Sequence, residues 1–200
     1  MLKRTHMALP LESTPHLIGL SQQVEQALAG EHPEVLAAVR DAQNTWKGLH
    51  DRLIAIIVGF LDDAVQQGSD LAELLERVRL RTTVGVPNTA TAAPDPHKIA
   101  ALLRSHGAVG SVHVTESAVV FEHACGSGQQ YWRNHPETPK TREGEVPGVP
   151  AGLPRYCARC IDTVDALGTA GWLVTPPSSL EERCRWTVPV SIQQRFADPK

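Results

Sequence analysis

The stretch FEHACGSGQQYW (residues 121–132), together with YCARC (156–160) and RCRW (183–186), contains every cysteine of this 200-residue chain. These cysteines are Cys125, Cys157, Cys160 and Cys184. The Cys157-x-x-Cys160 pair offers two thiols from one tight turn, and the other two thiols come from separate segments. Because zinc takes about four soft or borderline ligands, we expect the four thiols to converge on one ion that organises the second half of the chain.

The ligand set of this metal site has more than one solution. Four thiolates would close the coordination shell and make the ion structural. His123 precedes Cys125 by two residues, so in an extended strand both side chains point to one face and could reach one ion. Three cysteines with His123 are the alternative, and only three protein ligands would leave a position for water and for hydrolytic or lyase chemistry. We expect zinc as the cofactor, with iron as the alternative.

Two other interpretations of the cysteines compete with metal binding. Cys157 and Cys160 could form a thiol-redox pair, because a thiolate at a helix start is stabilised. The plainest alternative is that all four are small buried side chains without chemistry. Metal binding remains the prediction, since a CxxC, an HxC and a further lone cysteine fit zinc ligation better than either alternative.

Gly126-Ser127-Gly128 follows the first cysteine directly. Its backbone N–H groups could receive an anion or oxyanion, or its glycines could let the chain fold around a metal-bound sulfur, and we favour the second. Ser127 is a candidate catalytic serine, but the sequence offers no identifiable base for it and no strand–turn–helix context.

Histidines supply the remaining catalytic candidates. His113 and His123 fall on two neighbouring predicted strands, and His135 lies in a loop beside Tyr131, Trp132 and Arg133. His113 or His135 could carry a proton in a pocket lined by these side chains, since histidine titrates near neutrality. Solvated or packed histidines are the more ordinary interpretation. His16, His32 and His50 lie on predicted N-terminal helices without the spacing of a metal site.

Helical spacing dominates residues 13–83. A first helix is predicted from Thr14-Pro15 to Gly30 and a long one from His32-Pro33 to Gly68. The apolar positions of the long helix step by three and four: Val35, Val39, Ala42, Trp46, Leu49, Leu53, Ile56 and Phe60. This pattern is typical of a bundle or coiled coil. Around residues 54–61 the helix is apolar on nearly every face, so we expect burial all round and a homodimer through the N-terminal helices.

The rest of the chain alternates between short helices and strands. Asp70 with Glu73 predicts the cap of a third helix, and Asp95-Pro96 caps a fourth. The remaining predicted features are a linker at 84–96, a β-hairpin around Glu116-Ser117, a long irregular loop at 134–154, a helix at 158–167, and strands at 171–175 and 184–190. The predicted fold class is therefore α+β: a helical region at 13–83, the linker, and a zinc-centred domain with short antiparallel strands at 97–190.

Bulk composition narrows the function classes. The formal net charge of −3 and the pI near 6.3 give no basic footprint for nucleic acid. The most apolar run, residues 53–61, is too short to cross a bilayer, and we expect a cytoplasmic protein with reduced thiols. We expect a small-molecule ligand and no membrane or nucleic-acid partner.

The motifs CGSG (125–128), YCxxC (156–160), Pro176-Pro177 and Cys184-x-Trp186 resemble those of a group of uncharacterised bacterial proteins. More distantly, the closing portion is similar to the L-2-amino-thiazoline-4-carboxylic acid hydrolase-like and V4R-type small-molecule-binding domains. The resemblance covers roughly residues 97–190. It implies an α+β domain that holds a small molecule, a site formed by the four cysteines, and His123 as the more replaceable member.

Three function classes follow from these observations. The first is a zinc-binding small-molecule enzyme of hydrolase or lyase type in a specialised metabolic pathway, with a loop at 129–154 over a pocket beside the metal. The second is a non-catalytic ligand sensor or regulator with a structural zinc site. The third is a thiol-redox protein that uses Cys157 and Cys160.

Overall fold

The computed structural model describes residues 16–18, 20–28, 30–82, 96–166 and 173–189. Its helices are α1 (Leu20–Leu28), α2 (Pro33–Gln66), α3 (Leu71–Thr82), α4 (Pro96–Ser105), α5 (Gly128–Asn134) and α6 (Arg155–Ala166). Its strands are β1 (His16–Leu17), β2 (Val109–Val114), β3 (Ala118–Ala124), β4 (Leu173–Thr175) and β5 (Cys184–Pro189). The strands pair antiparallel in the order β1-β2-β3-β5-β4, so the fold is α+β.

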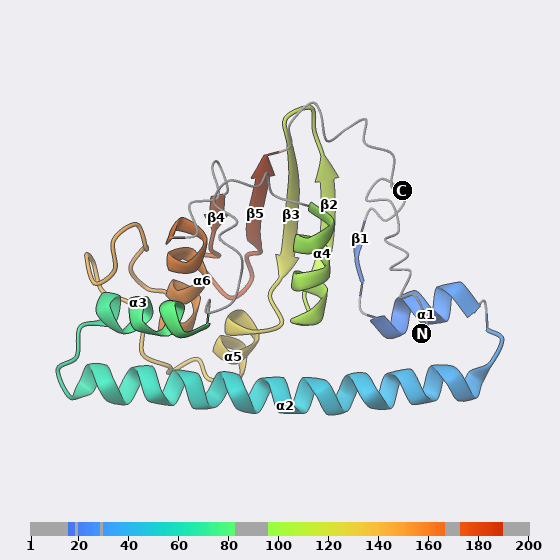
Figure 1. Ribbon diagram of the computed structural model, residues 1–200, viewed down its shortest axis with the longest axis horizontal. Coiled ribbons are helices and arrows are strands. Elements are labelled where there is room, and N and C mark those ends of the chain that lie inside the picture. Colours follow the sequence, from blue (N-terminus) through green and yellow to red (C-terminus); the bar gives the residue numbers. More distant parts are fainter. Residues whose placement is uncertain (1–15, 19, 29, 83–95, 167–172, 190–200) are drawn as a thin grey trace.

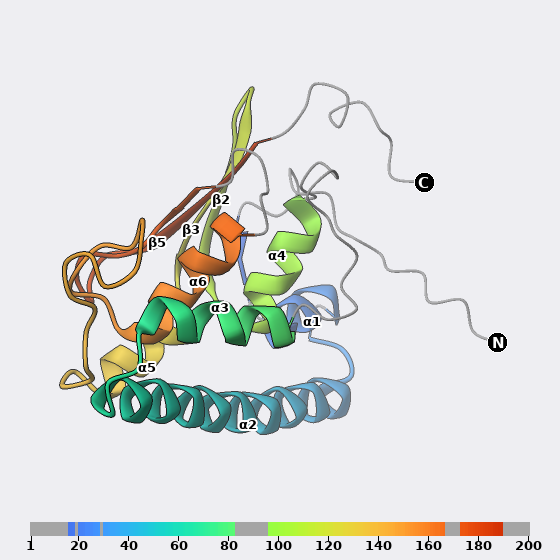
Figure 2. The same cartoon turned by 60° about the vertical axis from the view of Figure 1, so that its left-hand side comes forward.

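The elements form a sheet covered on one face and supported from below. Figures 1 and 2 show α4 and α6 over one face of the sheet, with α2 running beneath the strand ends as a long base. In Figure 1, α1 and α3 lie above the two ends of α2, and α5 lies between α2 and the end of β3. No helix in the described ranges is long and apolar enough to span a membrane.

The sheet contributes one hydrophobic core. Along β3 the buried side chains are Val119, Phe121 and His123, while Ala118, Val120 and Glu122 are only half-buried. The odd-numbered side chains of β3 therefore face the core. The core consists of Leu17, Ile99, Ala100, Leu103, Ala108, Val112, Val119, Phe121, Cys184, Trp186 and Val188. The last predicted strand is present as β5, and its Cys184, Trp186 and Val188 side chains face this core.

A second core joins the N-terminal helices to the later part of the chain. Its members are Leu61, Leu71, Leu75, Val146, Val149, Leu153, Ala158 and Ile161. The same contact region holds a buried ion pair, because Arg155 Nη1 of α6 donates to Asp62 Oδ1 of α2 over 2.9 Å. The predicted linker at 84–96 lies outside the described residues except for Pro96, which begins α4.

The N-terminal helices differ from the prediction at their start. His16 and Leu17 pair with β2 instead of opening a helix, so His16 lies on a strand and α1 begins only at Leu20. Edge pairing wins here because it buries Leu17 completely, with 0% exposed. The long helix and the third helix are confirmed, and the Glu73 backbone N–H donates to Asp70 Oδ1 over 3.0 Å as a cap requires.

The expected burial of α2 on every face is wrong within one chain. Leu53, Ile56 and Phe60 are 58%, 64% and 76% exposed. The reason is geometric: all packed elements lie on one side of the helix (Figure 2), and a single layer covers only part of its circumference.

The predicted long loop is neither fully irregular nor loose. Residues 128–134 form α5, and residues 141–153 fold back on themselves. Thr141 closes this segment: its N–H donates to the Leu153 carbonyl over 2.7 Å and its hydroxyl to the Pro150 carbonyl over 2.8 Å. Val146, Val149 and Leu153 belong to the second core, so this part of the predicted loop is packed against the helices.

Candidate functional site

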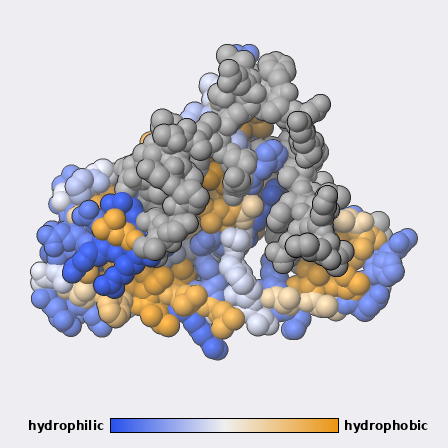
Figure 3. Space-filling view, in the orientation of Figure 1, coloured by the Kyte–Doolittle hydropathy of each residue, from blue (hydrophilic) through white to orange (hydrophobic). Residues whose placement is uncertain are grey.

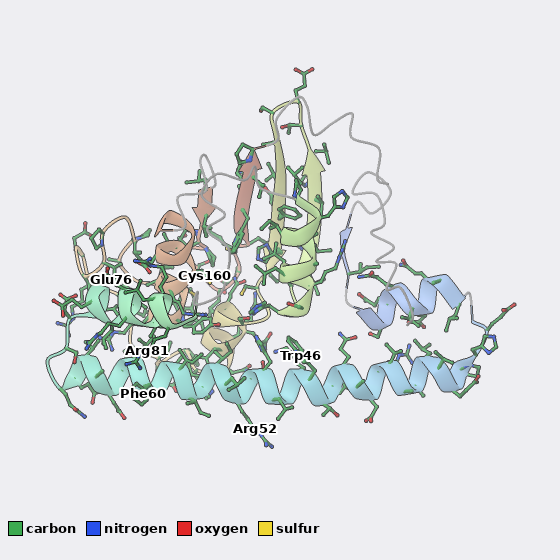
Figure 4. The ribbon with its side chains drawn as sticks, in the orientation of Figure 1. Trp46, Arg52, Phe60, Glu76, Arg81 and Cys160 are labelled. Atoms are coloured by element: carbon green, nitrogen blue, oxygen red, sulfur yellow. The ribbon has the colours of Figure 1, made fainter. Side chains whose placement is uncertain are left out.

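The four thiols come from three separate pieces of backbone. Cys125 follows β3 directly, Cys157 and Cys160 lie in the first half of α6, and Cys184 begins β5. All four are free thiols. Figure 4 shows Cys160 on α6. The pKa values of three of these thiols depend on burial and on the other cysteines near them.

Each of these three thiols has its pKa raised by burial and by other cysteines of the set. Burial raises the pKa of Cys157 well above its ordinary value, and the charges of Cys160, Cys125 and Cys184 raise it further. Burial, then the charge of Cys125, raises the pKa of Cys160 to about 12, although Arg159 opposes this. Burial, then Cys125 and Cys160, raises the pKa of Cys184 to about 12. Close thiols in a low-dielectric interior therefore stay protonated unless a cation compensates them.

The glycines of the CGSG turn have a steric role. A Cβ on Gly126 would lie 2.1 Å from the His106 carbonyl oxygen, and one on Gly128 would lie 2.9 Å from Cys157 Sγ. Between them, the Ser127 backbone N–H donates to Cys125 Sγ over 3.3 Å. The glycines thus let the turn pack against sulfur and backbone, as the favoured interpretation of this motif requires.

The thiols do not form a metal site as their side chains stand. Across the described ranges, no group of three or more His, Cys, Asp or Glu side chains is arranged to hold an ion. His123 is paired directly with Cys184 across β3 and β5. Its ring is 1% exposed, and its Nδ1 atom has no hydrogen-bond partner in this part of the chain. Burial lowers the pKa of His123 to about 4, which keeps the imidazole neutral near pH 7.

Ser127 lies in a second polar cluster, which the sequence did not reveal. Its Oγ is 3.0 Å from His50 Nε2 of α2 and 3.0 Å from His106 Nδ1, just beyond the end of α4. His50 Nδ1 is in turn 3.1 Å from Asp51 Oδ1. Ser127 and His50 are 4% and 8% exposed. The imidazole in contact with Ser127 therefore comes from a residue 77 positions earlier in the chain.

A pocket of about 70 Å³ opens beside this cluster, between α2 and α5. Its α2 side is formed by Asp51, Ile54 and Ala55, and its α5 side by Ser127, Gln130, Tyr131, Asn134 and His135. The Tyr131 and His135 rings stack with centroids 4.4 Å apart. Two of the three candidate catalytic residues, Ser127 and His135, are thus brought to one pocket.

The third candidate, His113, lies elsewhere. It is exposed on β2, with Nε2 3.1 Å from Ser111 Oγ. His113 and His123 lie on neighbouring strands as predicted, but the hairpin register pairs His113 with Val120 and His123 with Gly110, so the two histidines are not cross-strand neighbours. The turn residues alone do not determine the pairing register of a hairpin, and a shift of one residue changes every cross-strand partner.

Comparisons with protein-family models, with curated proteins and with solved structures found no match. The functional inference therefore rests on the side chains of the site and their geometry.

Proposed function

We propose that this protein binds one zinc ion through Cys125, Cys157, Cys160 and Cys184, and that the ion fixes the α+β half of the chain beside a small-molecule pocket. The observation that carries the proposal is geometric: strand pairing sets Cys184 opposite His123, two residues before Cys125, and the CGSG turn packs at Gly128 against Cys157 Sγ. The thiols stay protonated without a cation, and a bound metal ion would deprotonate them and hold them as thiolates.

Zinc binding requires side-chain rotation from the arrangement described above. The backbone that carries Cys184 and the Cys157–Cys160 pair is fixed by β5 and α6, so we expect the adjustment to lie in the side chains. Four thiolates complete a tetrahedral shell, which makes the ion structural. His123 is the reserve ligand, because a neutral imidazole with an unpartnered nitrogen suits a metal.

A structural ion leaves the chemistry to the pocket between α2 and α5. We favour a small-molecule enzyme of hydrolase type over a non-catalytic sensor, because the pocket wall carries a serine hydrogen-bonded to a histidine. The thiol-redox alternative is less favourable. Burial raises the pKa values of Cys157 and Cys160, whereas an attacking thiol needs a lowered one.

The exposed stripe on α2 supports a homodimer as part of the same proposal. The stripe comprises Leu49, Leu53, Ile56 and Phe60, which are 56–76% exposed. Figure 3 shows apolar surface along α2, and Figure 4 shows Arg52 projecting away from the rest of the molecule on this helix. Steps of four, three and four make the stripe self-complementary. In an antiparallel pair, Leu49 of one copy would face Phe60 of the other, and Leu53 would face Ile56.

Metal analysis tests the zinc site. Chelator-washed protein reloaded with zinc should hold one ion per chain, and X-ray absorption should report four sulfur neighbours. Changing any one cysteine to serine should lower the occupancy, and His113→Gln is the matched control that should keep it. Full occupancy in Cys184→Ser, or a first shell of nitrogen and oxygen, would remove the four-cysteine site.

A further inference from the structure

Ser127 Oγ, His50 Nε2 and His106 Nδ1 contact one another, with His106 Nδ1 3.3 Å from His50 Nε2, and we assign the direction in which Ser127 donates to His50. An ionised carboxylate only accepts, so Asp51 takes the hydrogen of His50 Nδ1 and leaves Nε2 with a lone pair. The Ser127 hydroxyl then donates to His50 Nε2, and His106 Nδ1 donates to Ser127 Oγ. Assigned in this way from the network, each hydrogen is used once.

The Asp51 carboxylate is held in place for this task. Burial alone would raise its pKa, but hydrogen bonds from Lys47 and His50 outweigh burial and lower it. Lys47 Nζ also donates to the Gly126 carbonyl over 3.1 Å. The lysine thus ties the carboxylate to the residue just before Ser127.

Packing limits how His50 can move. The Trp46 ring stacks on His50 with centroids 4.9 Å apart and an interplanar angle of 26°. The His106 ring meets His50 edge-on, with centroids 5.2 Å apart. An imidazole held between two rings and a carboxylate presents one nitrogen to Ser127, which is the preorganisation that proton transfer needs.

We propose that Ser127 is a nucleophile, His50 its general base and Asp51 the residue that positions His50, in a site that hydrolyses short-chain carboxylic esters. A nucleophile within hydrogen-bond reach of a base that a third group orients is the arrangement that activates serine on unrelated folds. The assignment does not depend on the zinc ion, although Ser127 lies two residues from Cys125.

The chemistry balances with water as the only co-reactant. Ser127 Oγ forms a bond to the carbonyl carbon of the ester while its proton passes to His50 Nε2. The bond from that carbon to the alcohol oxygen then breaks, and the alcohol leaves with the proton from His50. Water attacks the acyl-serine, returns a proton through His50 to Ser127 Oγ, and releases the carboxylic acid.

The pocket limits the acyl group. Its volume of about 70 Å³ is several times the roughly 10–15 Å³ that one bound water needs, so it has room for a small acyl group such as acetyl. Ile54 and Ala55 provide an apolar wall for the methyl group, and Tyr131 and Asn134 provide polar edges. We therefore assign acetyl esters as the substrate class.

The test uses full-length, zinc-loaded protein with p-nitrophenyl acetate and with phenylmethanesulfonyl fluoride. We expect a burst of one nitrophenolate per chain, and mass spectrometry should find the acetyl or sulfonyl group on Ser127. The sulfonyl probe forms a bond from Oγ to sulfur and releases fluoride, with the proton taken by His50. Ser127→Ala should abolish labelling, and His50→Gln should slow the burst by about 10²-fold or more.

Matched variants separate this site from surface reactivity. Ser178→Ala and His113→Gln change an exposed serine and an exposed histidine and should leave the burst unchanged. Asp51→Asn should slow the burst without weakening competitive inhibition by acetate, and Asp51→Glu should restore part of the rate. If Asp51 had only a structural role, Asp51→Asn would weaken acetate inhibition along with the burst rate, and Asp51→Glu would not recover the rate.

Zinc content and thermal unfolding, measured on the same samples, keep the two proposals apart. The assignment of Ser127 as the nucleophile would be wrong if Ser127→Ala, with normal zinc content and melting temperature, were labelled as fast as the wild-type protein. Absence of a burst in zinc-loaded wild-type protein would overturn it as well. Neither result would bear on the four-cysteine site, whose failure would appear as missing zinc alone.

Discussion

The inner and outer faces of α2 have similar side chains but different surroundings. The inner face buries His50, Ile54, Val58, Leu61 and Asp62. The outer face leaves Leu49, Leu53, Ile56 and Phe60 more than half exposed. Hydrophobic periodicity predicts both stripes equally. It indicates which residues are apolar enough to be buried, but not which surface covers them. The inner stripe also carries the polar side chains of His50 and Asp62, and each is hydrogen-bonded to residues of the same chain. This face is therefore fully packed within one copy of the protein.

The largest effect is expected where the inner face holds a charge. Asp62→Ala removes the 2.9 Å partner of the buried Arg155 and leaves only Glu145, 3.7 Å away, which should still cost about 3 kcal/mol or more of unfolding free energy. Asp63→Ala, at the exposed neighbouring position, should stay within about 0.5 kcal/mol. Urea unfolding of both variants makes the comparison, and equal losses would contradict it.

Two isoleucines offer the same substitution on opposite faces. Ile54 is 4% exposed and Ile56 is 64% exposed. Ile54→Ala should destabilise by about 2–5 kcal/mol, because it creates a cavity. At micromolar protein or below, Ile56→Ala should cost much less than Ile54→Ala in the same denaturation experiment. A larger loss for Ile56→Ala would mean that the outer face is packed even in the single chain.

Association should respond to the outer face only. We expect light scattering to give twice the 21.7 kDa chain mass for wild-type protein. Phe60→Glu should raise the dimer dissociation constant by at least about tenfold, or about 1.4 kcal/mol. Leu80→Glu, an equally drastic change at an exposed leucine of α3, should not. A wild-type protein that stays monomeric at millimolar concentration would end the dimer proposal.

The smallest effect concerns a glycine of the outer face. A Cβ on Gly59 meets nothing within 4 Å, and glycine inside a helix costs about 0.5–1 kcal/mol relative to alanine. Gly59→Ala should therefore raise the stability of dilute protein by about that amount, measured by thermal unfolding. If Gly59→Ala lowered the stability of dilute protein, Gly59 would be in contact with another part of the same chain. If it weakened association, Gly59 would lie in the interface with the second copy.

Local signals in the sequence predicted much of the fold. Pro33, the Asp70–Glu73 cap and Gly68 act within a few residues of themselves, so α2 and α3 were predictable from sequence alone. The two-residue pairing of β1 was not, because its gain comes from the neighbouring strand rather than from Leu17 and its flanks.

The candidate site was predictable only where its members share a motif. The cysteines have recognisable spacing, whereas His50 and His106 are joined to Ser127 only by the way α2 and α4 pack. The adjacent pair His50-Asp51 was the one available signal, and a histidine beside an aspartate on a helix is too common to be informative. Packing that brings distant segments together has no local signature.

The core that α2 and α3 share with residues 146–161 has a consequence for how the chain can be divided. A fragment that begins at residue 97 would carry Val146, Val149 and Ile161 without the leucines that cover them. It would also leave the Arg155 guanidinium without the carboxylate of Asp62. Such a fragment should precipitate when expressed, while co-expression with residues 30–82 on a separate polypeptide should recover soluble material.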